Sequence, residues 1–320
     1  MINIVVLDAA TLGSDLDLSP LDAVGKVTVY QNTPPESVNE RLKNADVVLI
    51  NKVKLNETNL SGLKNLKLIC IAATGFDNVD TAYCKKSGIA VCNVVGYSTD
   101  SVAQLTVAMA LYLTNHLYEY TDATRTGRYS AGKTANILTP VYHELAGKTW
   151  GIAGYGNIGK KVGKIAEALG CKVIVFKRTP DKSAECVDLD ELCRRSDILS
   201  IHLPLNDATR GIFSREKIAL MKRDAILINV ARGAVTDEAA LADAVKEGKI
   251  GGIGVDVYSA EPFREDHPFF AIKEYPNVCL TPHMAWGAYE ARKRCLEEII
   301  MNINSFFAGG TRNRVDNIKG

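Results

Sequence analysis

The chain has 320 residues, of which 47% are hydrophobic and 23% are charged, and its formal net charge is +1. This composition is typical of a globular protein with room for two domains, and the near-zero charge gives no electrostatic basis for binding nucleic acid or a membrane surface. The eight cysteines include no C-x-x-C pair, and neither a signal peptide nor a membrane-spanning run is recognisable. We therefore expect a cytoplasmic protein with reduced thiols and no metal site.

In the first hundred residues, short apolar runs alternate with helix-like stretches. This alternation predicts a parallel sheet with crossover helices. The expected strands lie at 4–7, 27–30, 47–50, 68–71 and 90–93. The strongly apolar stretch 101–120 then predicts one long helix, which is apolar on nearly every side and is therefore expected between domains.

A glycine motif near the middle of the chain, Gly154-x-Gly156-x-x-Gly159, follows an apolar run at 149–153 and precedes a helical pattern at 157–169. In a dinucleotide-binding turn, the first glycine permits the tight turn and the second lets a pyrophosphate approach the backbone. The third lets helix and strand pack closely, and the phosphates lie at the helix N-terminus. An ordinary strand–helix turn is the alternative, but the strand and helix on either side favour a dinucleotide site.

A second alternating series continues from this motif. Helices are expected at 157–169, 188–195, 215–221 and 237–247, which gives a doubly wound sheet of about six strands. The strands after the first are expected at 172–176, 197–202, 225–230, 251–257 and 278–281. A last helix is expected at 288–308, before Gly309-Gly310.

Three polar residues fall just after strand ends of this second series: Arg232, Glu261 and His283. Each alone has a simple explanation as a solvated loop, turn or surface residue. Together, at the edge where such sheets bind ligands, they suit hydride exchange on a 2-hydroxy acid. Arg232 would bind the carboxylate, His283 would donate or accept the hydroxyl proton, and Glu261 would fix the imidazole tautomer and favour its charged form.

Several ordered motifs together resemble those of the D-isomer-specific 2-hydroxyacid dehydrogenases, and the resemblance covers nearly the whole chain. The motifs are ATGFDNVD (73–80), NVVGYSTDSVAQL (93–105), GIAGYGNIG (151–159), HLPLNDATRG (202–211), NVARG (229–233), GVDVYSAEP (254–262) and TPH (281–283). Within the family, glycerate dehydrogenases, also called hydroxypyruvate or glyoxylate reductases, are the most similar group, on 93–105, HELAGKT (143–149) and Trp286.

The resemblance implies an α/β fold of two Rossmann-like doubly wound domains. A flavodoxin-like substrate domain would comprise 1–100 and 288–320, and an NAD(P)-binding Rossmann domain 101–287. The active site would lie in the cleft between them, and homodimers are usual, with 122–142 as a segment that reaches a neighbouring subunit.

The resemblance also implies residue roles. Arg232, Glu261 and His283 would be catalytic, with His283 as the proton donor. Backbone amides around Ala73, Thr74 and Gly75 would contact the substrate carboxylate, beside Arg232 and His283. Trp286 would form a wall of the substrate pocket, although packing alone also explains it.

One position departs from the usual NAD site, which places an acid at the end of the second strand to bind the ribose hydroxyls. Here that position is Lys177, followed by Arg178 and Thr179, with no acid before Asp181. Cations and a hydroxyl can bind a 2′-phosphate, so the sequence favours NADP. NAD with two solvated cations remains the alternative.

The predicted cofactor contacts combine the fingerprint, this strand end and the resemblance. His202 is expected to line the site without acid–base work. The full set is Gly154, Gly156, Asn157, Ile158, Gly159, Lys177, Arg178, Thr179, His202, Leu203, Pro204, Thr209, Val230, Ala231, Arg232, Asp256 and His283.

The sequence thus predicts a dehydrogenase that interconverts a small 2-oxo acid and a D-2-hydroxy acid. Hydroxypyruvate or glyoxylate is the preferred substrate, ahead of a larger 2-oxo acid. The competing interpretation is a nucleotide-sensing, corepressor-like binding protein on the same fold, against which the intact Arg232, Glu261 and His283 set weighs.

Overall fold

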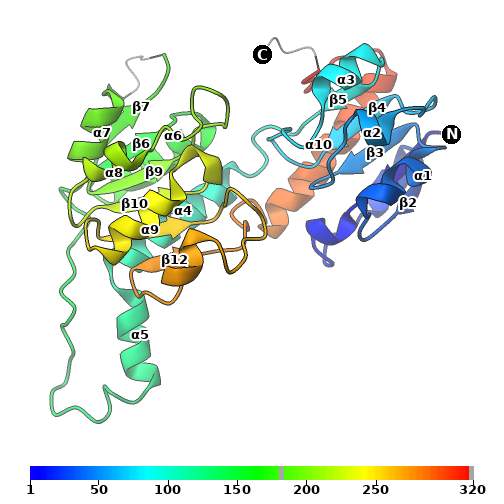
Figure 1. Ribbon diagram of the computed structural model, residues 1–320. Helices are drawn as coiled ribbons and strands as arrows, with labels where there is room; N and C mark the ends of the chain where they lie inside the picture. Colours follow the sequence, from blue (N-terminus) through cyan, green and yellow to red (C-terminus); the bar gives the residue numbers. More distant parts are fainter. Residues whose placement is uncertain (180–183, 317–320) are drawn as a thin grey trace. The chain divides into compact units, whose positions relative to one another are not determined.

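The computed structural model describes residues 1–179 and 184–316. The chain divides into two compact units (Figure 1), unit 1 comprising Met1–Ser98 with Gly287–Gly320 and unit 2 comprising Thr99–Trp286. These divisions lie close to the predicted domain boundaries. Each unit is built on a parallel sheet with helices, so the predicted α/β class with two Rossmann-like folds is confirmed.

Unit 1 is built on a five-stranded parallel sheet in the order β2-β1-β3-β4-β5, which is the flavodoxin-like order. The five strands agree with the predicted runs to within a residue or two. Their bounds are β1 Asn3–Val6, β2 Lys26–Val29, β3 Val47–Ile50, β4 Leu68–Ile71 and β5 Ala90–Cys92. β3 and β4 are fully buried, because a central parallel strand has helices over both faces, and the edge strand β5 is fully buried as well.

The helices of unit 1 come from both ends of the chain. The α-helices are α1 Val38–Leu42, α2 Glu57–Leu60, α3 Thr81–Lys86 and α10 Tyr289–Phe307, and the 3-10 helices are η1 Ala9–Leu12, η2 Ser19–Ala23 and η3 Pro35–Ser37. α10 packs against β4 and ends at Phe307, and Gly309 follows its C-cap with a φ of 82°, which suits glycine. Beyond it, the Val315 N–H donates to the Val91 carbonyl, so the segment around Arg314 and Val315 pairs with β5.

Unit 2 is built on a seven-stranded parallel sheet in the order β12-β11-β10-β9-β6-β7-β8. The bounds are β6 Thr149–Ala153, β7 Lys172–Phe176, β8 Glu185–Cys186, β9 Ile198–Ile201, β10 Ile226–Asn229, β11 Gly252–Val255 and β12 Val278–Leu280. The prediction of about six strands missed β8, a two-residue edge strand without an apolar run. The strand order reverses between β6 and β9, which is where doubly wound sheets bind dinucleotides.

The helices of unit 2 confirm the predicted ones except for the first. Their bounds are α4 Thr99–Thr114, α5 Leu117–Arg125, α6 Asn157–Ala168, α7 Leu189–Arg195, α8 Arg215–Ala219, α9 Glu238–Lys246, η4 Gly233–Val235 and η5 Pro268–Ile272. The prediction of one helix over 101–120 is wrong, because the chain turns at His116, which has a left-handed φ of 50°. His116 Nδ1 lies 3.2 Å from Glu119 Oε1 in the first turn of α5.

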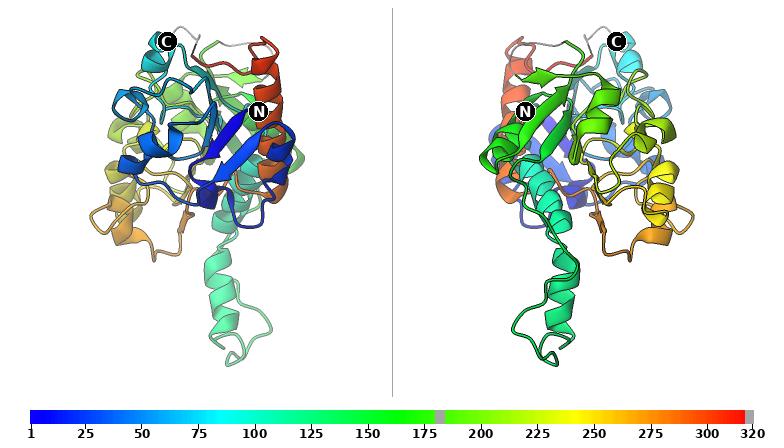
Figure 2. Two further views of the ribbon diagram at one scale, coloured as in Figure 1. Left: turned by 90° about the vertical axis from the view of Figure 1, so that its right-hand side faces the viewer. Right: turned by 90° about the vertical axis from the view of Figure 1, so that its left-hand side faces the viewer.

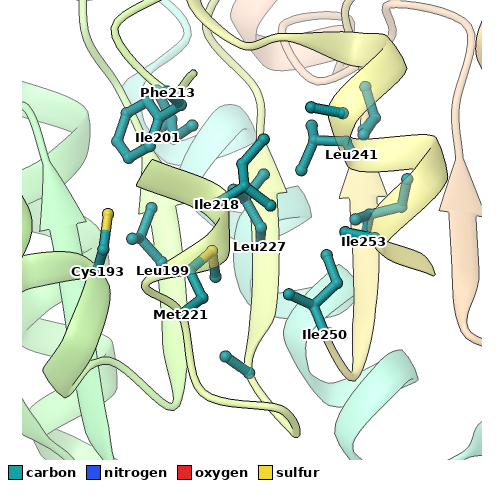
Figure 3. Packing of buried hydrophobic residues seen from close by; sticks show 14 of the residues in the cluster. Cys193, Leu199, Ile201, Phe213, Ile218, Met221, Leu227, Leu241, Ile250 and Ile253 are labelled. Atoms are coloured by element: carbon teal, nitrogen blue, oxygen red, sulfur yellow. The ribbon is translucent and has the colours of Figure 1, made fainter. Parts of the chain in front are cut away.

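One hydrophobic core of unit 2 forms where α7, α8 and α9 cover one face of the sheet (Figure 3). Side chains of these helices meet those of β9, β10 and β11. The labelled residues include Cys193, Ile218, Leu227, Leu241 and Ile253. α4 and α6 pack against each other, and α4 contacts β10, β11 and β12. This packing fixes the carboxyl ends of the strands, from which the candidate site is built.

α5 and the segment after it extend away from the rest of unit 2 in every view (Figures 1 and 2). Apolar side chains on this arm, defined as residues 117–142, are exposed, with Leu138 and Val141 each at 69% and Tyr142 at 51%. The arm returns on itself through the Tyr120 hydroxyl, which donates to the Pro140 carbonyl. Among the described residues, no helix is long and apolar enough to cross a membrane.

Candidate active site

The glycine motif forms the turn between β6 and α6. Gly154 has a φ of 95°, and a Cβ there would lie 2.7 Å from the His202 carbonyl carbon of the neighbouring strand end. A Cβ at Gly159 would lie 2.1 Å from the Gly154 carbonyl oxygen. Both positions therefore require glycine, one for backbone conformation and both for close packing.

Gly156 differs from these two glycines, because a Cβ there would meet no atom of residues 1–179 or 184–316 within 4 Å. Open space thus adjoins the backbone where α6 begins. The first-turn amides of α6 (Asn157, Ile158 and Gly159) precede the first intrahelical donor, Lys160, whose N–H reaches the Gly156 carbonyl at 2.9 Å. No acidic residue stands in this first turn. The turn therefore fits a pyrophosphate, which needs room, free amide donors and the positive end of a helix dipole.

The residues that bear on cofactor choice begin beside this turn. The Gly154 N–H donates to the Phe176 carbonyl at 2.8 Å, and Lys177 is the next residue. Lys177 is half-buried, whereas Arg178 and Thr179 are exposed. The structure therefore places the predicted cationic strand end next to the glycine turn. Asp181 lies outside the described residues.

His202 follows β9 and is hydrogen-bonded to β6, the strand that precedes the glycine motif, since its N–H donates to the Ala153 carbonyl at 2.7 Å. Its Nε2 lies 3.1 Å from the Ser200 hydroxyl, which also accepts from Trp150 Nε1 at 3.0 Å. Burial lowers the pKa of His202 from 6.5 to about 3. The imidazole is therefore neutral near pH 7, which agrees with a residue that does no acid–base work.

The segment after His202 makes a tight local turn. The Thr209 hydroxyl donates to the Pro204 carbonyl at 2.6 Å and accepts from the Asn206 N–H. Leu203 is buried and Pro204 is exposed. These contacts show Thr209 shaping the loop, and its contact with a cofactor remains a prediction, as do those of Leu203 and Pro204.

His283 and Glu261 come from different strand ends and meet in the structure. His283 Nδ1 lies 2.6 Å from Glu261 Oε2, with 21% of the His283 side chain and 31% of the Glu261 side chain exposed. An ionised carboxylate can only accept, so the proton of this contact is carried by Nδ1. Nε2 is thereby left for a reacting group. His283 also has a left-handed φ of 53°, an uncommon backbone conformation of the kind found at functional sites.

Neighbouring groups hold this pair in place. The Tyr258 N–H donates to Glu261 Oε1 at 3.0 Å, and the Tyr258 hydroxyl donates to the Thr281 carbonyl at 2.8 Å. The buried Asp256 carboxylate accepts from the Thr281 hydroxyl at 2.6 Å and from the amides of Met284 and Ala285. Burial raises the pKa of Asp256 against these hydrogen bonds. The loops after β11 and β12 are therefore fastened to each other.

Arg232 stands at the end of β10, one strand over from β11. Its backbone carbonyl accepts from Asn229 Nδ2 at 3.0 Å, and the next residue, Gly233, packs against the loop that carries Glu261. A Cβ at Gly233 would lie 2.1 Å from the Tyr258 carbonyl carbon. Three adjacent strands thus present Arg232, Glu261 and His283 at the carboxyl end of the sheet. Val230 is buried and Ala231 half-buried on the approach to Arg232.

In unit 1, the predicted substrate loop Ala73–Gly75 follows β4. The Thr74 carbonyl accepts from Asn93 Nδ2 at 2.7 Å, and the Thr74 hydroxyl donates to the Val94 carbonyl. In a trans peptide the N–H points opposite to the C=O, so Asn93 directs the Gly75 N–H the other way. Within the described part of unit 1, the amides of residues 73–76 have no acceptor. Such a run of free donors suits an anion.

Other predicted residues have structural explanations of their own. Trp286 is half-buried and packs against the core cluster beneath α4 and α6, so packing accounts for it, and a substrate contact remains a prediction. Asp256 also has a structural explanation, because its carboxylate accepts hydrogen bonds from the loop that carries His283. Its contact with a cofactor remains a prediction. Tyr258 and Asn93 support the site but are not recognisable from the sequence, because each donates to a backbone carbonyl about twenty residues away in the chain and no motif marks such a contact.

Comparison with known proteins adds to this geometry. The family model for the NAD-binding domain of D-isomer-specific 2-hydroxyacid dehydrogenases matches residues 107–285. The chain is 39% identical over 288 residues to a glycerate dehydrogenase of Methylorubrum extorquens, covering 90% of this chain and 91% of that protein. It is 36% identical over 322 residues to a hydroxypyruvate reductase of Blautia hydrogenotrophica, covering 98% and 99% of the two chains.

Solved structures agree in fold. An acyclic imino acid reductase in complex with NADPH and D-Arg superposes with a TM-score of 0.88 at 30% identity, covering 98% of this chain and 100% of that one. A D-lactate dehydrogenase of Aquifex aeolicus complexed with NAD and lactic acid gives 0.84 at 29% identity, covering 99% and 100%. Relatives of this fold therefore include complexes with each of the two nicotinamide cofactors.

Proposed function

This chain belongs to the D-isomer-specific 2-hydroxyacid dehydrogenase family, and from that premise we propose that it reduces hydroxypyruvate or glyoxylate to D-glycerate or glycolate with NADPH. The observation that carries the proposal is the 2.6 Å contact between His283 and Glu261, one strand away from Arg232 and on the sheet that bears the glycine turn. The relatives named glycerate dehydrogenase and hydroxypyruvate reductase support this choice of substrate.

The residues that would hold the dinucleotide are those around the open space at Gly156, the strand end at Lys177 and the loops after β9, β10 and β11. When bound, the nicotinamide supplies the hydride. The protein's part is to orient the ring and the substrate carbon toward each other and to stabilise the charge that develops on the substrate oxygen.

His283 is the proton donor in this proposal. Its Nδ1–H is held by Glu261, so Nε2 is the nitrogen that faces the substrate oxygen. With Nδ1–H held by the Glu261 carboxylate, a protonated ring can give its Nε2 proton to the substrate oxygen as the hydride reaches the carbon. In the reverse direction, the neutral ring accepts the hydroxyl proton.

Arg232 and the loop Ala73–Gly75 are proposed to bind the substrate carboxylate. A guanidinium matches a carboxylate with two parallel hydrogen bonds and also polarises the neighbouring carbonyl. The amides of residues 73–75, which have no acceptor among the described residues of unit 1, offer further donors to the same kind of group. Both features support an anionic 2-oxo acid as the substrate over a simple ketone.

The preference for NADP is supported by the residues at the end of β7. Lys177 directly follows Phe176, whose carbonyl is bonded to the glycine turn, and Arg178 and Thr179 are exposed beside it. A carboxylate at this position would repel a 2′-phosphate, whereas these side chains can donate to it.

The proposed activity is tested with a panel of 2-oxo acids, each assayed with NADH and with NADPH by nicotinamide absorbance. His283→Ala is expected to lose turnover while its Kd for the cofactor stays unchanged. A nucleotide-sensing, corepressor-like protein would instead bind the cofactor and turn over no 2-oxo acid. Turnover that survives in His283→Ala would refute the proton-donor assignment.

We also propose that the protein is a homodimer and that the arm of residues 117–142 contributes to the interface. The exposed apolar side chains of Leu138, Val141 and Tyr142 are a poor match for water and a good match for a second copy of this chain. A Leu138→Asp/Val141→Asp variant is expected to sediment as a monomer where the wild type sediments as a dimer. A monomeric wild-type protein would contradict the proposal.

A further inference from the structure

We propose that Glu238 is a positioning residue for Glu261, an inference that rests on the proposed function. Glu238 is the first residue of α9, after the N-cap Asp237, and it is 8% exposed. A buried carboxylate requires hydrogen-bond donors, so its partners show what it is for. No step of the proposed reaction uses this group.

Three donors converge on the Glu238 carboxylate. The Ser259 N–H donates to Oε1 at 2.9 Å, the Ser259 hydroxyl donates to Oε2, and His267 Nε2 lies 3.1 Å from Oε2. His267 Nδ1 accepts from the Phe269 N–H at 3.2 Å, so the ring proton is on Nε2 and points at the carboxylate. His267 is itself buried, at 9% exposure.

These partners stand at the two ends of one loop. Ser259 opens the segment 259–267 and His267 closes it, and Glu261 lies between them. The intervening residues are exposed except for the half-buried Phe263, so the loop has little core packing of its own. One buried carboxylate therefore fastens both ends of the loop that carries Glu261.

The contacts of Glu238 with Ser259 lie beside the hydrogen bond that holds Glu261. The Tyr258 N–H, one residue before Ser259, donates to Glu261 Oε1 at 3.0 Å. The backbone of residues 258 and 259 also packs against Gly233, where a Cβ would lie 2.2 Å from the Ser259 nitrogen. A shift of Ser259 would thus move the contact that orients Glu261 toward His283.

The consequence for the reaction is a loss of alignment. A catalytic group displaced by about 1 Å can lower the rate about 100-fold. We expect Glu238→Ala to lower kcat by about that factor. The Kd for NADPH should change less than about threefold, because β10 and β9 separate β11, which precedes this loop, from β6, which precedes the glycine turn. Glu238→Gln keeps the shape but turns one acceptor into a donor facing the His267 N–H, so a smaller loss is expected.

A double-mutant cycle separates positioning from general stability. If Glu238 acts through Glu261, then in a Glu261→Gln background the Glu238→Ala change should lower kcat less than about threefold, which is strongly non-additive. The same loss of about 100-fold in both backgrounds would overturn the inference, because independent effects add in free energy.

Two further variants keep the test decisive if Glu238→Ala folds poorly. His267→Asn retains an acceptor for the Phe269 N–H but is too short to reach Glu238. It therefore removes the contact with the Glu238 carboxylate and keeps the N-cap of η5. It should lower kcat about tenfold, an intermediate loss of alignment. Leu192→Ala in α7 opens a cavity elsewhere in the core of unit 2 and should leave kcat unchanged.

The outcomes distinguish this inference from the function on which it rests. Absence of turnover by the wild type, with every 2-oxo acid, would refute the proposed function. Turnover by the wild type with an unchanged kcat in Glu238→Gln and His267→Asn would overturn the role of Glu238 alone. A loss of kcat in Leu192→Ala equal to theirs would do the same.

Discussion

Exchanging the cation at the end of β7 for an acid should reverse cofactor preference. Lys177 is half-buried and directly follows the residue bonded to the glycine turn. Two unit charges 4 Å apart interact by about 1 kcal/mol in bulk water and about 4 kcal/mol near a protein surface. Taking about 2 kcal/mol for the lost attraction, Lys177→Asp should weaken selection of NADPH about 30-fold, since 1.4 kcal/mol is tenfold.

The total shift should exceed that loss. An acid in this position repels the 2′-phosphate and accepts from the ribose hydroxyls of NADH, so the two effects act in the same direction. The ratio of kcat/KM with NADPH to kcat/KM with NADH should therefore fall about 100-fold or more, given a further contribution of at least about 1 kcal/mol from the new hydrogen bond.

The assay measures kcat/KM for both cofactors at saturating 2-oxo acid. Lys172→Asp is the matched control, because it makes the same charge change at the exposed opposite end of β7. Five residues of strand place it more than about 10 Å from Lys177, beyond the screening length in 0.1 M salt. Equal ratios in the two variants, or a wild-type ratio that favours NADH, would refute the reasoning.

Three further outcomes follow from the site. Gly156→Ala should leave the free energy of unfolding within about 1 kcal/mol of wild type but lower cofactor affinity at least tenfold, whereas Gly159→Ala, with its Cβ 2.1 Å from a backbone oxygen, should destabilise by about 1–3 kcal/mol in chemical unfolding. Asn93→Ala should raise the KM for the 2-oxo acid about two- to tenfold at unchanged Kd for NADPH, because it frees the Thr74 carbonyl. His202→Gln should flatten the pH dependence of unfolding. In the wild type, His202 has a pKa of about 3 when folded and about 6.5 when unfolded, so acidification protonates only the unfolded chain and removes about 2 kcal/mol between pH 7 and pH 5.

The strands and most helices could be predicted because apolar periodicity encodes them. The glycine motif likewise located the turn between β6 and α6, since its spacing follows from backbone contacts. The break at His116 was not predictable from the apolar pattern, which continues across it. β8 was missed because an edge strand of two residues needs no hydrophobic run.

The positions of candidate site residues could be predicted from the sequence where the residue comes soon after a recognisable strand. Arg232 and His283 lie three residues beyond the ends of β10 and β12, and parallel strands bring such positions to the same end of the sheet. The supports were not predictable, because their partners are set by loop paths. Glu238 is one residue in an ordinary helical pattern, and only the fold brings Ser259 and His267 to its carboxylate.

The most direct test of the proposed reaction follows hydrogen itself. Hydroxypyruvate is reduced with nicotinamide cofactor deuterated at the transferable position, and the product is examined for configuration and deuterium content. The proposal predicts that the wild type forms D-glycerate with one deuterium at carbon 2 and that His283→Ala forms no product. Product without deuterium at that carbon, or labelled product formed equally well by His283→Ala, would contradict it.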